Sequence, residues 1–396
     1  MRTDTDGCQI MGARIYLDHA AAAPLVPAAA RAITAALGVV GNPSSIHGEG
    51  RAARVLLDRA RAEVAAQAGI GQDGVVFTGS GSEALALAIH GLAGASAPRE
   101  ARGMVAVSAI EHPCVHATAE QLAAAGVVLA RIDVDRHGRL DGDALARALA
   151  AGASTVVIGA VNHELGVVQD LAGISAQVRA AGARLVVDAV AAAGKLPLPP
   201  LCALADAVAI ASAKVGGPAG VGALLLASEL RLPPRLPGHQ ERGRRGGSEN
   251  LLGIVGFAAA LAAADPAEWA EVAARGARLE AGALAIPGVS VHGAGAPRVG
   301  GLINLDVGAG LGQAVVIGLD LEGIATSTGA ACSSGTLAPS PVLLALGHDP
   351  AAARGVVRIS LGRSTTDAEI DAVLAVLPLV LARARAHAPG LEHRTV

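Results

Sequence analysis

Short runs of β-branched and aliphatic residues alternate with segments of helical periodicity through the first two thirds of the chain. Between the runs lie segments such as 116–126 and 171–182, in which apolar residues recur at helical spacing. A rhythm of strand, helix and strand indicates a mainly parallel sheet with helices on both faces. The pattern predicts an α/β fold with a seven-stranded sheet, whose strands lie at 75–78, 104–108, 127–134, 154–160, 183–189, 207–212 and 222–227.

The pattern changes after about residue 265. Residues 265–284 have the pattern of one long helix, and several short strand-like runs and a final helix follow. The final helix opens with Thr366 and Glu369, which have the spacing of a capping box. This change predicts a division into a large domain, 18–265, and a smaller α+β domain formed by 1–17 and 266–396.

Composition limits the classes of function. Apolar residues make up 52% of the chain but aromatic residues only 1%, so Ala, Val, Leu and Ile must build the core. The formal net charge is −3 and the one basic cluster, 241–247, is short, which argues against a nucleic-acid partner. No run of about 18 apolar residues suggests a membrane span, and the N-terminus lacks the apolar region of a signal peptide. We expect a soluble, cytoplasmic protein with no membrane partner.

The chain has four cysteines, which lie far apart and form no C-x-x-C pair. This spacing favours neither a zinc site nor a disulfide framework, so reduced thiols are expected. Cys332 differs from Cys8, Cys114 and Cys202 because glycine, serine and alanine flank it on both sides. Such a segment is typical of a flexible loop, in which a thiol would be exposed.

Lysine is almost absent, because Lys195 and Lys214 are the only lysines among 31 lysine and arginine residues. Arginine replaces lysine in most surface roles, but only lysine can lose its proton and attack a carbonyl carbon. Lys214, in the apolar and glycine-rich segment 209–220, is therefore a candidate Schiff-base lysine. The alternative is a solvated lysine in a turn.

A lysine that binds pyridoxal phosphate requires a phosphate site, an acid for the pyridine nitrogen and a flat group against the ring. Residues 78–82 form a glycine-rich turn between a strand and a helix, where backbone N–H groups and Ser82 would bind phosphate. Asp188 ends a buried strand, where a carboxylate requires a cationic partner. His112 follows another strand and could stack on the ring. Each also has a structural alternative: a common turn, a helix cap and a structural histidine.

Taken together, the motifs resemble the class V aminotransferase group of pyridoxal-phosphate enzymes, and most closely the cysteine desulfurases of the NifS/IscS type. The resemblance covers nearly the whole chain. It rests on YLDHAAAAP, GNPSSIHGEGR, FTGSGSEA, EHPCV, VNHELGVVQDL, VVDAVAAAGKLP, SAKVGGPAGVGAL, QERGRRGGSEN, STGAACSSGTLAPSPVLLALG and VRISLGRSTT. It implies a fold-type I enzyme in which the small domain carries the catalytic cysteine loop.

The resemblance implies a role for each matching residue at the cofactor. Lys214 would form the Schiff base, Asp188 would pair with the pyridine nitrogen, and His112 would stack on the ring and, with Lys214, shuttle protons. The phosphate would be held by Gly81 and Ser82, and the region of the ring hydroxyl by Asn162. Ser248 matches a threonine that reaches the phosphate of the other subunit, which implies a homodimer with shared sites.

For the substrate, the resemblance implies L-cysteine. Arg358 would bind its carboxylate, with Asn42 and Asn162 shaping the same pocket. Cys332 would accept the sulfur as a persulfide, leaving L-alanine, and pass it to a sulfur-acceptor protein. The identity of that acceptor is left open.

Several positions around the cofactor depart from the family pattern. Ala213 and Ala211 replace a histidine and a serine that bind the phosphate, unless Ser212 substitutes, and Ala191 replaces a glutamine that reaches the ring hydroxyl. Each lost hydrogen bond would weaken cofactor binding by about 0.5 to 1.5 kcal/mol. Two alternatives therefore stay open: a selenocysteine lyase or another class V lyase or aminotransferase, and a non-catalytic member that acts as a binding partner.

Overall fold

The computed structural model describes residues 14–94, 103–227, 230, 232–329 and 338–387. Its centre is a seven-stranded sheet with strand order β2-β8-β7-β6-β5-β3-β4. Only β8 runs antiparallel to its neighbours, so the prediction of a mainly parallel sheet is confirmed. The strands are β2 (Val75–Thr78), β3 (Met104–Ser108), β4 (Leu129–Ile132), β5 (Ala153–Gly159), β6 (Arg184–Asp188), β7 (Ala207–Ala211) and β8 (Gly222–Leu226).

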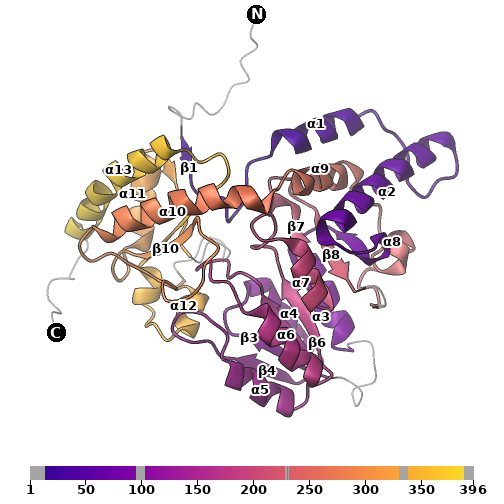
Figure 1. Ribbon diagram of the computed structural model, residues 1–396, viewed down its shortest axis with the longest axis horizontal. Helices are drawn as coiled ribbons and strands as arrows, with labels where there is room; N and C mark the ends of the chain where they lie inside the picture. The colour runs from indigo at the N-terminus through magenta and orange to yellow at the C-terminus, as the bar shows by residue number, and fades with distance from the viewer. Residues whose placement is uncertain (1–13, 95–102, 228–229, 231, 330–337, 388–396) are drawn as a thin grey trace, which may run out of the picture.

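Helices cover both faces of this sheet (Figure 1). Successive side chains of a strand point to opposite faces. Val105 and Val107 accordingly pack with α3 (Gly81–Leu92) and α4 (Pro113–Ala124), whereas Ala106 packs in the core on the other face. That second core is covered by α2 (Gly48–Ala68), α5 (Gly142–Ala150), α6 (Leu171–Ala180), α7 (Leu198–Leu204) and α9 (Leu251–Ala262), with α1 (Pro27–Ala36) against α9.

The C-terminal part contains a three-stranded antiparallel sheet in the order β12-β10-β9. Its strands are β9 (Ser290–Val291), β10 (Leu302–Asp306) and β12 (Val356–Ser360), and its helices are α10 (Trp269–Leu284), α11 (Gly312–Leu321), α12 (Pro341–Ala345) and α13 (Asp367–Ala386). The predicted capping box of the last helix is present. This part contains the predicted α+β elements, while the exact domain limits stay a prediction.

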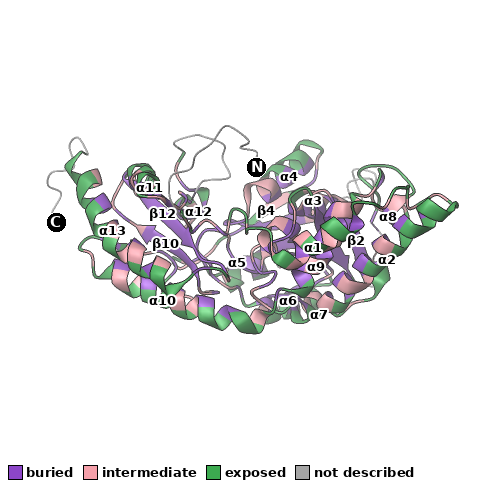
Figure 2. Ribbon diagram, turned by 90° about the horizontal axis from the view of Figure 1, so that it is seen from above, coloured by how far each residue is buried: buried purple, intermediate pink, exposed green. Residues whose placement is uncertain are grey.

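Two features join the parts of the molecule. Strand β1 (Ile15–Tyr16) pairs in parallel with β11 (Ile324–Ala325), so the start of the described chain lies against its C-terminal part. Helix α10 runs from near the end of α9 toward α13 and packs against α13, β9 and β10 (Figure 1). The burial view shows buried strands enclosed by helices whose outer faces are exposed (Figure 2). Among the described residues, no single helix could cross a membrane by length and composition, and only a sharply bent pair, Leu251–Ala262 with Pro266–Leu284, meets that test together.

Candidate active site

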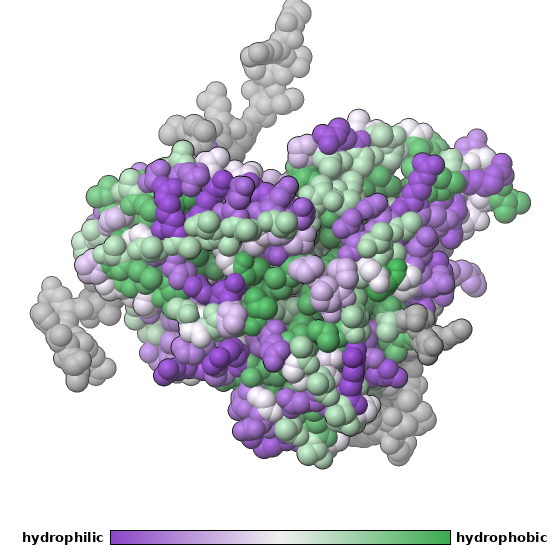
Figure 3. Space-filling view, viewed as in Figure 1, coloured by the Kyte–Doolittle hydropathy of each residue, from purple (hydrophilic) through white to green (hydrophobic). Residues whose placement is uncertain are grey.

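A pocket opens where parallel strands of the large sheet end. Gly159 ends β5, Asp188 ends β6 and Ala211 ends β7, and all three line it. Open α/β sheets bind their ligands at the carboxyl ends of the strands. Apolar surface gathers near the centre of the face seen in Figure 3, between the two parts of the molecule. The polar and ionisable side chains that line the pocket belong to Ser80, Ser82, Glu111, His112, Cys114, Asn162, His163, Gln169, Asp188, Lys195, Lys214 and Arg358.

One wall of the pocket is the N-terminus of α3. Ser80 caps this helix and its hydroxyl accepts the backbone N–H of Glu83 at 3.0 Å. Gly81 follows, and a Cβ at that position would lie 2.7 Å from Val190 Cγ2 and 3.2 Å from Ala211 Cβ. Only glycine therefore fits, because Val190 and Ala211 pack closely against the first turn of α3. A helix N-terminus of this kind attracts an anion.

Lys214 ends a short 3-10 helix, Ser212–Lys214, that follows β7. Its Nζ donates hydrogen bonds to the backbone carbonyls of Ala20 at 2.8 Å and Ala21 at 2.5 Å. These carbonyls come from the loop after β1. The amine is therefore directed into the pocket by strands of the large sheet and by the N-terminal segment together.

Asp188 is buried, with 8% of its surface exposed. Burial raises its pKa to about 6, although the N–H of Val190 and the charge of Lys214 favour the ionised form. Val190 donates that hydrogen bond to Oδ1 at 2.9 Å. The Val190 N–H and the Lys214 charge do not offset the effect of burial on the Asp188 carboxylate. A cationic ligand in the pocket would stabilise its ionised form further.

Glu111 is a second buried acid of the pocket. Burial, with the charge of Asp188, raises the pKa of Glu111 to about 8. Its Oε1 accepts the N–H of Gly159 at 2.8 Å. Two close carboxylic acids in a desolvated site do not both ionise. At neutral pH Asp188 is therefore the ionised acid of the pair, and Glu111 keeps its proton.

His112 caps α4, and its Nδ1 accepts the N–H of Cys114 at 3.2 Å. Burial, together with the charge of Lys214, lowers the pKa of His112 to about 4. The ring is therefore neutral at physiological pH. It meets His163 edge to face, with the ring centroids 5.2 Å apart.

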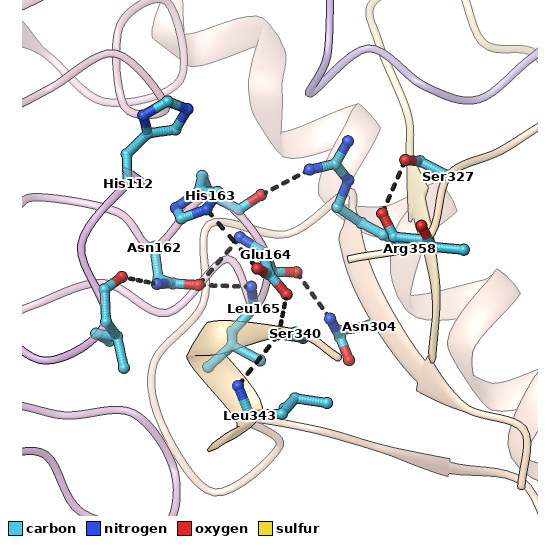
Figure 4. Close-up of polar contacts among 12 residues, drawn as sticks. His112, Asn162, His163, Glu164, Leu165, Asn304, Ser327, Ser340, Leu343 and Arg358 are labelled. Carbon is cyan, nitrogen blue, oxygen red and sulfur yellow. Dashed lines mark hydrogen bonds and ion pairs between the residues drawn. The ribbon is translucent and has the colours of Figure 1, made fainter. Parts of the chain in front are cut away.

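The segment from Asn162 to Leu165 forms a tight turn beside these rings (Figure 4). Asn162 Oδ1 accepts the N–H groups of Glu164 at 3.0 Å and Leu165 at 2.9 Å, and its Nδ2 donates to the carbonyl of Ile110 at 2.9 Å. The amide thus holds the turn, and one N–H of Nδ2 is left for a ligand. Burial raises the pKa of Glu164 to about 7, and this carboxylate accepts the hydroxyl of Ser340 at 2.6 Å.

Arg358, in β12, brings the small sheet to the pocket. Its Nη2 donates to Asp18 Oδ1 at 2.9 Å and its Nη1 to the carbonyl of His163 at 3.3 Å. The side chain is 2% exposed, and Nε has no hydrogen-bond partner. Arg358 is nevertheless a lining residue of the pocket, and a guanidinium group is suited to bind a carboxylate.

Some predicted site residues do not reach the pocket. Ala211 forms the wall, whereas Ser212, next in the chain, is fully buried with its hydroxyl against Gly217. The idea that Ser212 replaces a lost phosphate contact is therefore not supported, because adjacent residues at a strand end face opposite ways. Asn42 and Ser248 are exposed and line no part of the pocket. Cys332 lies outside the described residues.

Among the pocket residues that were not predicted as site residues are Glu111, His163 and Lys195. Each was visible in the sequence, since Glu111 precedes His112, His163 follows Asn162, and Lys195 is the second of the two lysines. Their chemistry depends on burial, which the sequence motifs did not reveal.

Comparison with known proteins agrees with this geometry. The family model "Aminotransferase class-V" matches residues 15–373. The chain belongs to the class V aminotransferase family. One similar member of the family is a cysteine desulfurase of Trichormus azollae, 38% identical over 95% of this chain and 94% of that protein.

Solved structures of the family show the same fold. A NifS-like protein from Rickettsia africae superposes with a TM-score of 0.84 at 28% identity, over 93% of this chain and all of that one. A protein described as SspA in complex with cysteine has a TM-score of 0.75 at 27% identity, over 89% of this chain and all of the other. The resemblance to this family that the motifs indicated is confirmed.

Proposed function

We propose that this class V aminotransferase family member is a pyridoxal-phosphate-dependent cysteine desulfurase. It converts L-cysteine into L-alanine and passes the sulfur through a persulfide on Cys332 to an acceptor protein. The observation that carries the proposal is the convergence of Lys214, Asp188, His112 and Arg358 on one pocket. The cysteine desulfurases among its relatives and the cysteine-bound structure of SspA support the choice of substrate.

The pocket fits pyridoxal phosphate. The N-terminus of α3 lines the pocket through Ser80, Gly81 and Ser82, and a helix N-terminus with a serine hydroxyl is suited to the phosphate. Asp188 is a buried acid suited to a pyridine nitrogen, and Lys214 is an amine suited to an aldehyde. The cofactor, when bound, supplies an electron-withdrawing ring that stabilises negative charge on the substrate carbon.

The chain's own residues would bind and orient the substrate. Arg358, which lines the pocket, would bind the carboxylate of cysteine through its guanidinium group. The neutral ring of His112 would stack on the cofactor, and the Lys214 amine can move protons at the substrate carbon.

The sulfur step would use Cys332, a role that rests on the sequence motif. Its thiolate attacks the sulfur of the substrate and forms an S–S bond. The C–S bond of the substrate breaks, its electron pair stays with carbon, and a proton completes the methyl group of alanine. Cysteine and the enzyme thiol thus yield alanine and an enzyme persulfide with no external oxidant.

The test is incubation of the purified protein with L-cysteine, with alanine and sulfide both measured. Cys332→Ala should abolish desulfuration. Cys202→Ala is the matched control, because Cys202 lies on α7 outside the pocket and burial raises the pKa of its thiol to about 12. Activity retained in Cys332→Ala would instead indicate a selenocysteine lyase or another lyase. A purified protein that takes up no pyridoxal phosphate would indicate a non-catalytic binding partner.

We further propose a homodimer with shared sites. Ser248 and Asn42 do not reach the pocket of their own chain, so a second copy would have to supply them. The connection after α1 also exposes apolar side chains: Leu37 is 62% exposed, Val40 74% and Ile46 90%. Burying such side chains against a second copy would be favourable.

Mixing two inactive variants tests this arrangement. A mixed dimer of Lys214→Ala and Ser248→Asp chains contains one site with both natural residues, if Ser248 acts across the interface. Activity should therefore return on mixing. No recovery, with dimers detected by light scattering, would place Ser248 outside the shared site.

A further inference from the structure

The segment that leads to Ser248 contains backbone in an unusual conformation. It begins with α8 (Gln240–Gly243), which lies beside α2 (Figure 1). Glu241 has φ 47° and ψ 37°, Arg242 has φ 58° and ψ 36°, and Gly243 follows at φ 77°, so all three are left-handed. Among the described residues, Glu241 and Arg242 are the only ones other than glycine with positive φ. Such residues are strained, persist only where their surroundings hold them, and concentrate at functional sites.

A buried ion pair holds this turn. Arg61 of α2 donates from Nη2 to Glu241 Oε1 at 2.6 Å and from Nη1 to Oε2 at 2.8 Å. The two side chains are 4% and 1% exposed. Glu241 Oε2 also accepts the N–H of Phe77 at 2.8 Å, and Arg61 Nη1 donates to the carbonyl of Val75 at 2.7 Å. Glu241 is therefore fixed both to α2 and to β2, the strand that leads into the glycine-rich turn before α3.

The segment is also fixed between this turn and Ser248. Arg245 Nε donates to Glu83 Oε1, in the first turn of α3, at 2.7 Å. The N–H of Gly247 donates to the side chain of Gln240 at 3.1 Å. Ser248 is the next residue, and it is exposed. The chain thus presents the Ser248 side chain at the end of a backbone that is held up to the preceding residue.

Stability alone does not explain a left-handed glutamate. Glycine adopts positive φ without steric cost, as Gly243 does in the same turn. Glycine at position 241 would lose the carboxylate that binds Arg61, so the ion pair and the strained backbone occur together. The turn sets the direction in which the chain continues toward Ser248.

We propose that Arg61 and Glu241 are positioning residues for Ser248. Their buried ion pair holds the left-handed turn, and the turn directs the Ser248 hydroxyl toward the cofactor phosphate of a second copy of this chain. The inference rests on the proposed function with its shared sites.

A first measurement asks whether the ion pair holds the turn. In the full-length, cofactor-free protein, Arg242→Gly and Arg242→Ala both remove the same ion pair with Asp73, but only glycine relieves the left-handed strain. Arg242→Gly should therefore melt about 2 °C higher than Arg242→Ala. The difference should disappear in an Arg61→Met/Glu241→Gln background, which removes both charges and leaves no buried charge unpaired. A difference of equal size in both backgrounds would overturn the proposal.

A milder variant covers the case in which that double variant does not fold. Arg61→Lys keeps the charge but cannot form the two parallel hydrogen bonds to the carboxylate. It should reduce the difference between the glycine and alanine variants in the same direction. An unchanged difference in a folded Arg61→Lys protein would overturn the proposal as well.

A second measurement asks whether the pair acts through Ser248. Ser248→Ala should weaken pyridoxal phosphate binding by about 3- to 10-fold, as measured by fluorescence titration. In the Arg61→Met/Glu241→Gln or Arg61→Lys background the same change should have a smaller effect, because the hydroxyl is no longer directed at the phosphate. Arg298→Met/Glu280→Gln is the matched control. It neutralises an ion pair of 2.6 Å at α10, and the full effect of Ser248→Ala should remain there.

The outcomes separate the inference from the proposed function. A full effect of Ser248→Ala in every background would refute the positioning role and leave the proposed function intact. No effect of Ser248→Ala in any background would refute the shared site and the inference with it. A wild-type protein that takes up no pyridoxal phosphate would refute the proposed function and the role of Ser248, while the melting comparison would still show whether the ion pair holds the turn.

Discussion

Two sides of the pocket are built in opposite ways. The α3 side consists of Gly81, Ser82, Val190 and Ala211, and offers backbone N–H groups and one hydroxyl. The Arg358 side consists of His163 and Arg358, whose guanidinium group is held by hydrogen bonds to Asp18 Oδ1 and to the backbone carbonyl of His163. The difference teaches that the α3 side would bind an anion mainly through its backbone, whereas the Arg358 side depends on individual side chains.

The largest effect is expected at Lys214, which lies between the two sides and serves both. Lys214→Ala should lower the rate by about 1000-fold or more, because under the proposed function it removes both the covalent link to the cofactor and a proton-transferring group. Mass spectrometry after borohydride reduction should find no cofactor attached to the variant. A covalent adduct found instead on Lys195 would contradict the assignment.

On the Arg358 side, Arg358→Gln should lower kcat/KM for cysteine by about 10- to 100-fold, mostly through KM. The reason is the loss of hydrogen bonds from a charged donor, each worth about 1.5 to 3 kcal/mol. Steady-state kinetics measure this effect. Asp18→Asn, which keeps the hydrogen-bonding shape next to Arg358, is the control and should change KM less. Equal effects of both variants would show that folding of the site, not carboxylate binding, was lost.

On the α3 side, a serine in place of Ala211 should strengthen anion binding and so increase the difference from the Arg358 side. Ala211→Ser adds a donor to the pocket wall and should tighten pyridoxal phosphate binding by up to about 10-fold. Ser212→Ala is the neighbouring control and should leave that affinity unchanged, because its hydroxyl faces Gly217. Fluorescence titration of the cofactor-free protein measures both. Weaker binding in Ser212→Ala would show that its hydroxyl does reach the cofactor.

The smallest effect concerns stability and pH. Burial raises the pKa of Glu111 from its ordinary value of 4.5 to about 8, so the folded state keeps a proton that the unfolded state releases. Its contribution to stability is present below pH 4.5 and is lost as the pH rises toward 8. In Glu111→Gln the stability of the folded state should no longer fall over this pH range because of residue 111.

Thermal unfolding of the cofactor-free protein measures how far the stability of the folded state falls with rising pH. Between pH 5 and pH 8 the melting temperature of the wild type should fall by about 2 °C more than that of the variant. Glu120→Gln, at an exposed position of α4, is the control and should behave like wild type. Parallel melting curves of wild type and Glu111→Gln would show that Glu111 is ionised in the folded state.

Much of the fold could be predicted because it depends on local patterns. The seven strands, the glycine-rich turn before α3 and the capping box at Thr366 all follow from residue spacing along a short stretch. The position of Asp188 at a strand end also followed from that spacing. Parallel strands then bring their carboxyl ends together, so Asp188 and Lys214 could be expected to meet.

Other features could not be predicted, because they depend on how a side chain is used after packing. The side-chain oxygen of Asn162 accepts hydrogen bonds from two backbone N–H groups of its own turn. His163, one residue later, meets the ring of His112. The sequence predicted that Ser212 could replace a lost phosphate contact. Side chains alternate in direction at the end of β7, and the Ser212 hydroxyl lies against Gly217, away from the pocket.

The sequence by itself determined the order of strands and helices, the family resemblance and the restriction of lysine to two positions. Only the tertiary structure placed those two amines at one pocket, set Glu111 beside Asp188 and brought Arg358 across from the small sheet. The physical reason is that desolvation and charge repulsion depend on distances in space. Hydrophobic periodicity records only which face of an element is buried.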